Sequence, residues 1–289
     1  MKKALALLLV ALMALSLFAC AKETPAPAAT PTPAANTEAN TDADVPAPPA
    51  DALAPDVQAI ADRGVLRVGV KVDVPLYGFL NPDTNEQEGL EADIARALAK
   101  AIIGDENAVE FQAVTAQTRG PLLDNGEVDV IIATFTITEE RKLSYNFTTP
   151  YFIDAIGFLV KKELGATTIT DLNGLTIGVA QSATTKAAIE EKAAELGIEV
   201  KFSEFASYPE LKTNLTSGRI DAFSVDKSIL LGYIDDNTEI IEETFKPQEY
   251  GIASKLTNVG LADYLNAFIA DMQADGSLEA LISKWGLDK

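Results

Sequence analysis

Short apolar stretches alternate with longer amphipathic ones from residue 65 to residue 284, and this alternation constrains the fold more than any other feature. Residues 65–71 (VLRVGVK) and 128–133 (VDVIIA) resemble strands, whereas residues 89–103 carry apolar side chains at helical spacing. Strands that are separated by helices form parallel sheets with helices on both faces. Roughly ten strand candidates within residues 56–289 favour two α/β lobes over a single one.

The remaining expected elements follow the same alternation. Expected strands cover residues 108–114, 175–180, 199–205, 221–225 and 250–254, and expected helices cover 119–125, 183–196, a segment ending at Gly218, 261–274 and 278–284. In such sheets, ligands bind beyond the carboxyl ends of the strands and near the first turns of the helices. We therefore expect the site at these strand ends.

The first 19 residues have the features of an export signal. Lys2 and Lys3 precede the apolar run Ala4–Leu17, which is too short to span a bilayer. The run leads into LFAC, which resembles a bacterial lipobox, and its Cys20 is the only cysteine of the chain. We expect a signal peptide over residues 1–19 and lipidation of Cys20. The protein would then be exported and anchored to the cell membrane, on the outer face or the periplasmic side. A plain secretory signal with an incidental cysteine is the alternative.

Residues 20–55 are expected to form a disordered tether. Eight of the 14 prolines lie in residues 21–55, together with many Ala and Thr residues and no aromatic residue. Such a composition buries too little apolar surface to offset the entropy of folding. A lipid anchor followed by this segment predicts a domain that is held near a membrane.

Composition excludes several classes of function. The chain has 289 residues, a net charge of −20 and no histidine. The negative charge argues against a nucleic-acid partner, which requires an excess of Lys and Arg. Without histidine and with one cysteine, there is no His-based triad, His-ligated zinc, intrachain disulfide or cysteine metal cluster. We also find no glycine-rich nucleotide motif, and we expect no cofactor, no metal and no enzymatic activity.

The segment after residues 128–133 reads TFTITEER and contains the first candidate site residues. Thr138 is a suitable N-cap for a helix that begins with two glutamates. Arg141 lies in the first helical turn, where the helix dipole disfavours a cation. It is therefore expected either to bind an anion collected by this helix end or to be a solvated surface residue. Thr134 and Thr136 add hydroxyl groups on the same side of the strand end.

Two further strand ends carry polar residues. Asp226 follows the strand 221–225, where it is either an N-cap for the next helix or a carboxylate that pairs with an ammonium group. The segment QSATTK contains Thr184 and Thr185, which can cap a helix or help its free N–H groups to bind an anion.

Four motifs occur in order: GLEADIARALAKAI, IIATFTITEERKLSYNFTTPY, GVAQSATTK and SGRIDAFSVDKSILLGY. Together they resemble the family of polar amino-acid-binding proteins that serve bacterial ABC importers, and the resemblance covers residues 56–289. It implies a bilobed α/β fold of the periplasmic-binding-protein type II, with the ligand between the lobes. It also implies an ABC transporter permease as partner and a monomeric chain.

The resemblance assigns roles and domains. Arg141 would bind the α-carboxylate and Asp226 the α-ammonium of the ligand. The hydroxyl groups implied as hydrogen-bond partners or near neighbours of the ligand are those of Thr134, Thr136, Thr184 and Thr185. Lobe 1 would comprise residues 56–154 and 250–289, and lobe 2 residues 155–249. The chain would cross between the lobes near residues 155–157 and 248–250.

The side chain of the ligand is the harder question. Lys71 lies where members that bind basic ligands carry an aspartate, so it reverses the local charge, and Arg119 is a second cation on the cleft side. With Arg141 they would place three cations against one anion, Asp226, which favours an acidic ligand. The motifs also look closest to the aspartate/glutamate-binding branch.

Each of these assignments has an alternative. Lys71 is otherwise a solvated residue at a strand end, and Arg119 otherwise pairs at the surface with Asp124. Tyr208, Tyr77 and Phe79 are further expected cleft residues. For the whole protein, the alternatives are a binding protein for glutamine or another polar amino acid, a cyclic-amino-acid dehydratase of the same fold, and a sensor or surface-interaction protein.

Overall fold

A computed structural model of the protein describes residues 52–288. The expected signal peptide, Cys20 and most of the expected tether lie outside the described residues. Leu53 and Ala54 already pack against the core, and α1 (Pro55–Arg63) begins with a proline at its first position. The folded part therefore begins slightly before residue 56. None of the helices within residues 52–288 is long and apolar enough to cross a membrane.

Lobe 1 is built on a five-stranded sheet of order β5-β1-β6-β14-β7. β1 runs parallel to β5 and β6, and β14 runs antiparallel to β6 and β7. α2 and α8 pack over one face with α1 and α9, and α3 packs on the other face. The lobe contains α1, β1 (Leu66–Val70), β2 (Asp73–Val74), β3 (Gly78–Leu80), β4 (Gln87–Glu88), α2 (Leu90–Ile103), β5 (Val109–Ala113), α3 (Arg119–Asn125), β6 (Val130–Ile131), α4 (Glu139–Lys142), β7 (Tyr145–Phe147), β14 (Ala253–Lys255), α8 (Val259–Ala274) and α9 (Ser277–Lys284).

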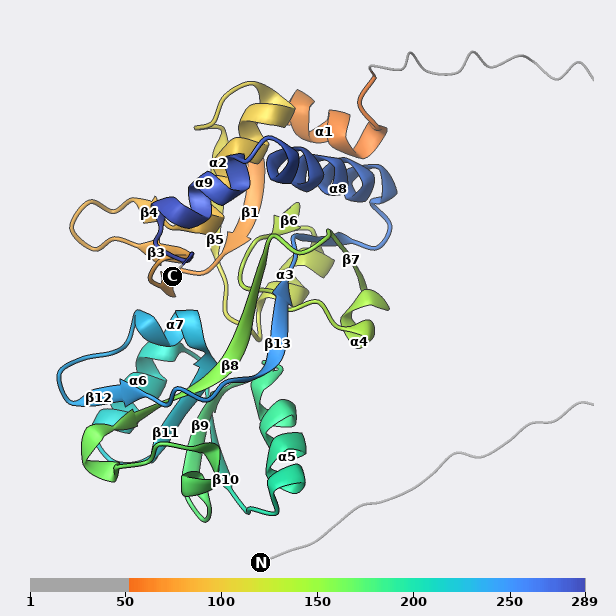
Figure 1. Cartoon of the computed structure of the whole chain (residues 1–289). Coiled ribbons are helices and arrows are strands. Elements are labelled where there is room, and N and C mark those ends of the chain that lie inside the picture. The colour runs from red at the N-terminus through yellow and green to blue at the C-terminus, as the bar shows by residue number, and fades with distance from the viewer. Residues whose placement is uncertain (1–51, 289) are drawn as a thin grey trace, which may run out of the picture. The chain divides into compact units, whose positions relative to one another are not determined.

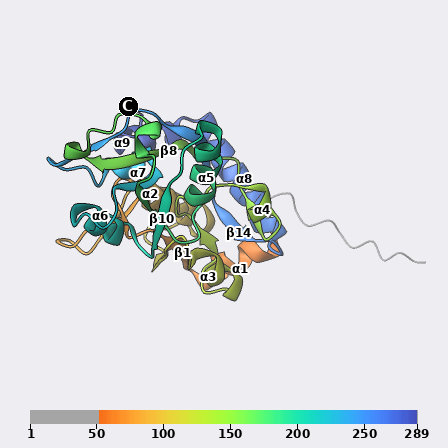
Figure 2. The ribbon, with the colours of Figure 1, turned by 90° about the horizontal axis from the view of Figure 1, so that it is seen from below.

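Lobe 2 is built on a sheet of order β10-β9-β11-β8-β12, with β13 paired to β8. Figure 2 shows α5 and α6 on opposite sides of β10. The lobe contains the 3-10 turns η1 (Lys162–Leu164) and η2 (Ile169–Leu172), and β8 (Phe152–Lys161), β9 (Thr176–Ala180), α5 (Thr185–Leu196), β10 (Lys201–Phe205), α6 (Tyr208–Thr216), β11 (Ala222–Asp226), α7 (Lys227–Leu231), β12 (Thr238–Ile240) and β13 (Phe245–Tyr250).

Both sheets are mixed, which corrects the expectation of purely parallel sheets. Within each sheet, the strands joined through helices are parallel, as β9, β10 and β11 are in lobe 2. β8 enters lobe 2 directly from lobe 1 and lies antiparallel to β11 and β12. The chain enters lobe 2 along β8 itself, and no helix lies between β7 and β8 to reverse its direction. β8 therefore runs opposite to the strands that follow helices in this sheet.

The long strands β8 and β13 connect the two lobes (Figure 1). They pair antiparallel from Phe152 with Tyr250 to Ile156 with Phe245, with an irregularity between Phe245 and Pro247. The expected crossings lie within these strands. The expected strand 250–254 is instead two strands, because Gly251 donates its N–H to Phe135 and leaves the ladder between β13 and β14.

The lobes contact each other directly on the side of β2 and α7. Tyr77 of lobe 1 and Ser228 of lobe 2 are hydrogen-bonded through their hydroxyl groups at 2.7 Å. The Tyr233 hydroxyl of lobe 2 donates to the main-chain oxygen of Asp73. Side chains that follow the strand ends of both lobes are therefore close together.

Candidate ligand-binding site

Arg141 extends from α4 across the cleft between the lobes. Its Nη1 donates to the main-chain oxygen of Thr136 at 2.7 Å, and its Nη2 donates to the main-chain oxygen of Ser182, in lobe 2, at 3.3 Å. Burial, and secondarily the charge of Arg119, lower the pKa of Arg141 to about 9. A guanidinium that is partly removed from water in this way is not a solvated surface group, so that alternative is wrong.

The start of α4 is capped as expected. The Thr138 hydroxyl accepts a hydrogen bond from the Arg141 N–H at 3.1 Å. The guanidinium of Arg141 lies 4.8 Å from the centre of the Phe135 ring. The cap and the ring together fix the direction in which Arg141 leaves the helix.

Asp226 is the buried carboxylate of lobe 2. Its residue is 5% exposed, and it occupies the N-cap position of α7, yet its side chain makes no capping hydrogen bond. Instead, Tyr250 donates its hydroxyl to Oδ2 of Asp226. Burial, followed by the nearby charge of Asp154, raises the pKa of Asp226 to about 7. The Asp226 side chain therefore does not cap α7.

Arg141 and Asp226 share one more property. No ion pair within residues 52–288 includes either side chain. A cation from lobe 1 and a carboxylate from lobe 2 thus have no charged partner of their own within residues 52–288, and of the two only Arg141 lines the groove described below. This arrangement is complementary to a zwitterion.

Lys71 follows β1 and is only 2% exposed, so the alternative of a solvated lysine is wrong. Its Nζ lies 3.2 Å from Oδ1 of Asp73 and 4.5 Å from the centre of the Tyr208 ring, which belongs to lobe 2. Tyr208 is buried at the start of α6 and donates its N–H to Asp73 at 3.4 Å. Burial lowers the pKa of Lys71.

Arg119 is buried at the start of α3, and the alternative of a surface pair with Asp124 is also wrong. Its Nη1 donates to the oxygen atoms of Ala133 at 2.7 Å and Thr134 at 3.1 Å. Its Nε has no hydrogen-bond partner in the described part of the chain. Asp124 instead accepts from the hydroxyl group of Tyr145.

Glu91 is a fully buried carboxylate on α2, and sequence analysis did not single it out. Its Oε1 accepts from the Thr134 N–H and from the Tyr151 hydroxyl, and its Oε2 has no hydrogen-bond partner among the residues that the structure describes. Burial raises the pKa of Glu91 to about 7. Glu91 lies three residues before Ile94 and therefore on the apolar face of α2. This position is the sequence signal that could have indicated a buried carboxylate.

The expectation of three cations against one anion is therefore wrong. Asp73 and Glu91 lie among Lys71 and Arg119, so this part of the cleft contains two cations and two carboxylates. Sequence analysis did not consider Asp73, although it lies only two residues after Lys71, and it took Glu91 as part of a helix without a site role.

The loops that line the cleft contain backbone strain. Thr134 has φ of 43° and Ser182 has φ of 60°, which are left-handed conformations that few non-glycine residues adopt. Such residues concentrate at ligand sites because the surrounding structure holds them in place. Thr185 is buried at the start of α5, and Thr184 donates its hydroxyl to Oε1 of Gln248 at 2.8 Å.

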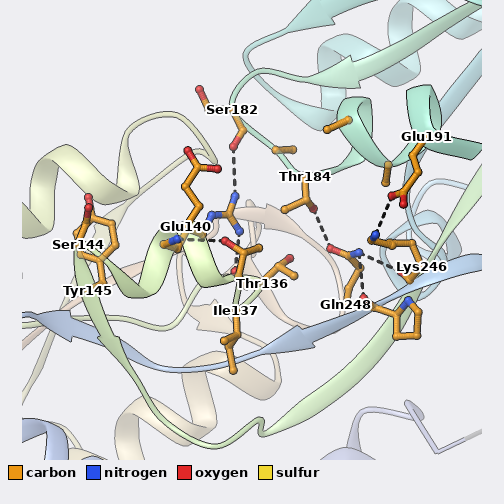
Figure 3. Close-up of a pocket in the computed structure, with 16 residues that line it drawn as sticks. Thr136, Ile137, Glu140, Ser144, Tyr145, Ser182, Thr184, Glu191, Lys246 and Gln248 are labelled. Atoms are coloured by element: carbon orange, nitrogen blue, oxygen red, sulfur yellow. Dashed lines mark hydrogen bonds and ion pairs between the residues drawn. The ribbon is translucent and has the colours of Figure 1, made fainter.

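A groove of about 690 Å³ runs along the α4 and α5 side of this cleft. Its lining includes Thr136, Arg141, Ser182, Thr184 and Gln248, from both lobes. Figure 3 shows Ser182, Thr136 and Thr184 lining this space beside Gln248. Of the further expected cleft residues, Tyr77 is buried and bonded to Ser228, whereas Phe79 is partly exposed and pairs with Asp73 in a small sheet.

Comparison with known proteins agrees with the fold. Residues 66–288 match the bacterial extracellular solute-binding proteins, family 3. The glutamine-binding protein of Geobacillus stearothermophilus is 42% identical over 68% of this chain and 75% of its own. The ABC transporter glutamine-binding protein GlnH of Bacillus subtilis (strain 168) is 39% identical over 78% of this chain and 83% of its own.

A solved structure, the solute receptor for L-cysteine of Neisseria gonorrhoeae, superposes with a TM-score of 0.74 at 31% identity. The match covers 80% of this chain and 94% of that one. The bilobed α/β fold and the amino-acid-binding family expected from the motifs are thereby confirmed. The chain belongs to family 3 of the bacterial extracellular solute-binding proteins, as a polar amino-acid-binding member that serves ABC import.

Proposed function

We propose that the protein binds L-glutamine between its lobes and passes it unchanged to the permease of an ABC importer. The observation that supports this most directly is the pairing of Lys71 with Asp73 at 3.2 Å, beside Arg119 and Glu91. Two cations and two carboxylates form a polar region with little net charge, which suits a neutral polar side chain.

The main-chain groups of the ligand would meet the residues expected for them. Arg141 of lobe 1 supplies a guanidinium for the α-carboxylate, and Asp226 of lobe 2 supplies a carboxylate for the α-ammonium. Both are buried or partly buried and lack an ion-pair partner, so a zwitterion would compensate two charges that burial otherwise penalises.

A side-chain amide presents both a donor and an acceptor. Within residues 52–288, Oε2 of Glu91 is buried without a hydrogen-bond partner, and so is Nε of Arg119. One atom requires a donor and the other requires an acceptor, which an amide NH₂ and C=O provide together. The names of the two relatives that bind glutamine agree with this choice.

An acidic amino acid is the second candidate, and the state of Glu91 favours it. Because burial raises the pKa of Glu91 to about 7, this carboxyl group is largely protonated below neutral pH. The region would then carry one net positive charge, which suits the carboxylate of glutamate or aspartate.

Calorimetric titration with glutamine, glutamate, asparagine and aspartate at pH 8 tests the proposal. We expect the wild type to prefer glutamine. Asp73→Asn should shift the glutamate-to-glutamine affinity ratio towards glutamate by tenfold or more, because Lys71 loses its anion. Glu195→Gln removes an exposed carboxylate paired with Lys192 and is the matched control. A wild type that prefers glutamate at pH 8 would establish the second candidate instead.

The same titrations separate binding from turnover. Mass spectrometry of the ligand after prolonged incubation should recover it unchanged, and loss of water from the ligand would favour the dehydratase alternative. A wild type that binds none of the amino acids would contradict the proposed function as a whole.

We also propose that the protein is anchored to the membrane through Cys20. The lipobox-like LFAC ending and the family's extracellular location support this assignment. Detergent-phase partitioning of cell extracts should place the wild type in the detergent phase and Cys20→Ala in the aqueous phase. If both partition into the aqueous phase, the anchor does not exist.

A further inference from the structure

Asp154 and Gln248 are paired with each other in the hinge. They face each other across β8 and β13 in the antiparallel ladder. Gln248 is 2% exposed, and neither residue was singled out from the sequence. The side chain of each residue makes hydrogen bonds to the start of a different helix of lobe 2.

Asp154 holds the start of α7. Its Oδ2 accepts from the Ser228 N–H at 3.1 Å and from the Ser228 hydroxyl. The first N–H groups of a helix need such acceptors, and a carboxylate there also interacts favourably with the helix dipole. Asp154 thus provides the capping interaction that Asp226 does not make. The Asp226 carboxylate is left to face Tyr250 and the cleft.

Gln248 holds the start of α5. Its Oε1 accepts from the Thr184 hydroxyl at 2.8 Å, as Figure 3 shows. Its Nε2 donates to the main-chain oxygen atoms of Lys246 at 3.0 Å and Pro247 at 3.1 Å. Lys246 has φ of 53° beside the irregularity in β13, so Gln248 ties the helix start to the distorted part of the hinge.

We propose that Asp154 and Gln248 are positioning residues through which the hinge fixes both ligand-facing helix starts of lobe 2. Asp154 orients the α7 start that carries Asp226, and Gln248 orients the α5 start at Thr184 and Thr185. Neither side chain needs to touch the ligand. The inference rests on the proposed function, because it assumes that these two helix starts bind an amino acid.

Calorimetry with L-glutamine at pH 8 tests the inference. We expect Asp154→Ala and Gln248→Met each to lower affinity about five- to tenfold or more, because a helix start loses its anchoring bond. Glu249→Gln and Ile153→Thr are matched controls, since both exposed residues pair with each other one position along the same strands. The controls should bind as the wild type does.

Asp154→Asn adds a readout that a purely structural role would not change. Asparagine can still accept from Ser228 but carries no charge, so affinity at pH 8 should stay within about threefold of the wild type. Asp226 is faced by Asp154 on β8, Tyr250 on β13, Arg119 on α3 and Arg141 on α4. Removing the Asp154 charge lowers the pKa of Asp226, so Asp154→Asn should keep its affinity to lower pH than the wild type.

Three results would overturn the inference. The first is folded Asp154→Ala and Gln248→Met proteins that bind glutamine as tightly as the two controls. The second is an affinity–pH profile of Asp154→Asn that coincides with the wild-type profile. The third is an Asp154→Asn affinity at pH 8 as low as that of Asp154→Ala. Thermal unfolding shows which variants are folded. In all three cases the wild type still binds, which separates failure of the inference from failure of the proposed function.

Discussion

The direct contact between the lobes makes Gly232 a steric probe of closure. Gly232 follows α7 in lobe 2 and has φ of −75°, so alanine fits its backbone conformation. A Cβ atom at this position would lie 2.9 Å from Cβ and Cγ and 3.0 Å from Cδ of Pro75 in lobe 1. Those distances are shorter than ordinary carbon contacts, and the pyrrolidine ring cannot rotate away.

The cost of Gly232→Ala should fall on the closed form alone. Overpacking of a tight contact costs about 1–3 kcal/mol, which corresponds to about five- to 150-fold in an equilibrium constant. Because the open form does not require this contact, thermal stability without ligand should change little. Affinity for glutamine should fall by that factor if closure accompanies binding.

Calorimetry and thermal unfolding of Gly232→Ala measure both quantities. Gly157→Ala is the control, because its added Cβ meets Leu230 at 3.4 Å and Lys227 at 3.5 Å within lobe 2, at ordinary contact distance. Pro75→Gly combined with Gly232→Ala removes all three clashing atoms and should restore affinity. Unchanged affinity of Gly232→Ala would refute the idea that the ligand-bound protein adopts this contact.

Two further predictions concern the buried charges. Asp226→Ala should weaken glutamine binding by about 3–5 kcal/mol, a hundredfold or more, because the ligand ammonium loses its counter-charge; an affinity close to wild type in calorimetry would contradict the role of Asp226. The pKa of Glu91 is about 7 in the folded protein and about 4.5 in the unfolded chain. Between these values the folded state binds more protons than the unfolded state, so the free energy of unfolding falls as the pH rises. The total loss from Glu91 is about 3 kcal/mol. Urea unfolding at pH 5 and pH 8 should therefore show a smaller loss of stability on raising the pH in Glu91→Gln than in the wild type, and equal losses would contradict the prediction.

Local signals predicted most of the elements. The helix expected over residues 119–125 coincides with α3, because Gly126 ends it in a left-handed conformation that glycine adopts without strain. Strand 128–133 is shorter than expected, since only Val130 and Ile131 pair in the sheet. The alternation of apolar residues reports burial, and buried residues continue past the end of the ladder.

The positions of Arg141 and Asp226 could be inferred because both follow strands whose ends meet at the cleft. The roles of Asp73 and Asp154 could not be inferred in the same way. Asp73 and Asp154 act through contacts with Tyr208 and Ser228, which lie 135 and 74 residues away in sequence. No local pattern encodes such a contact. Asp73, in contrast, lies only two residues after Lys71, so that part of the charge balance could have been considered from the sequence.

The two crossings between the lobes form one ribbon, because β8 and β13 pair with each other from Phe152 to Ile156, with one irregularity between Phe245 and Pro247. A two-stranded ribbon bends across its plane, but its strands cannot slide, since a shift by one residue would exchange the faces of every side chain. We therefore expect the lobes to open and close along a single path and to return to the same relative placement. A permease that touches both lobes at once can then distinguish a loaded protein from an unloaded one by the spacing of two surfaces, without contacting the amino acid itself.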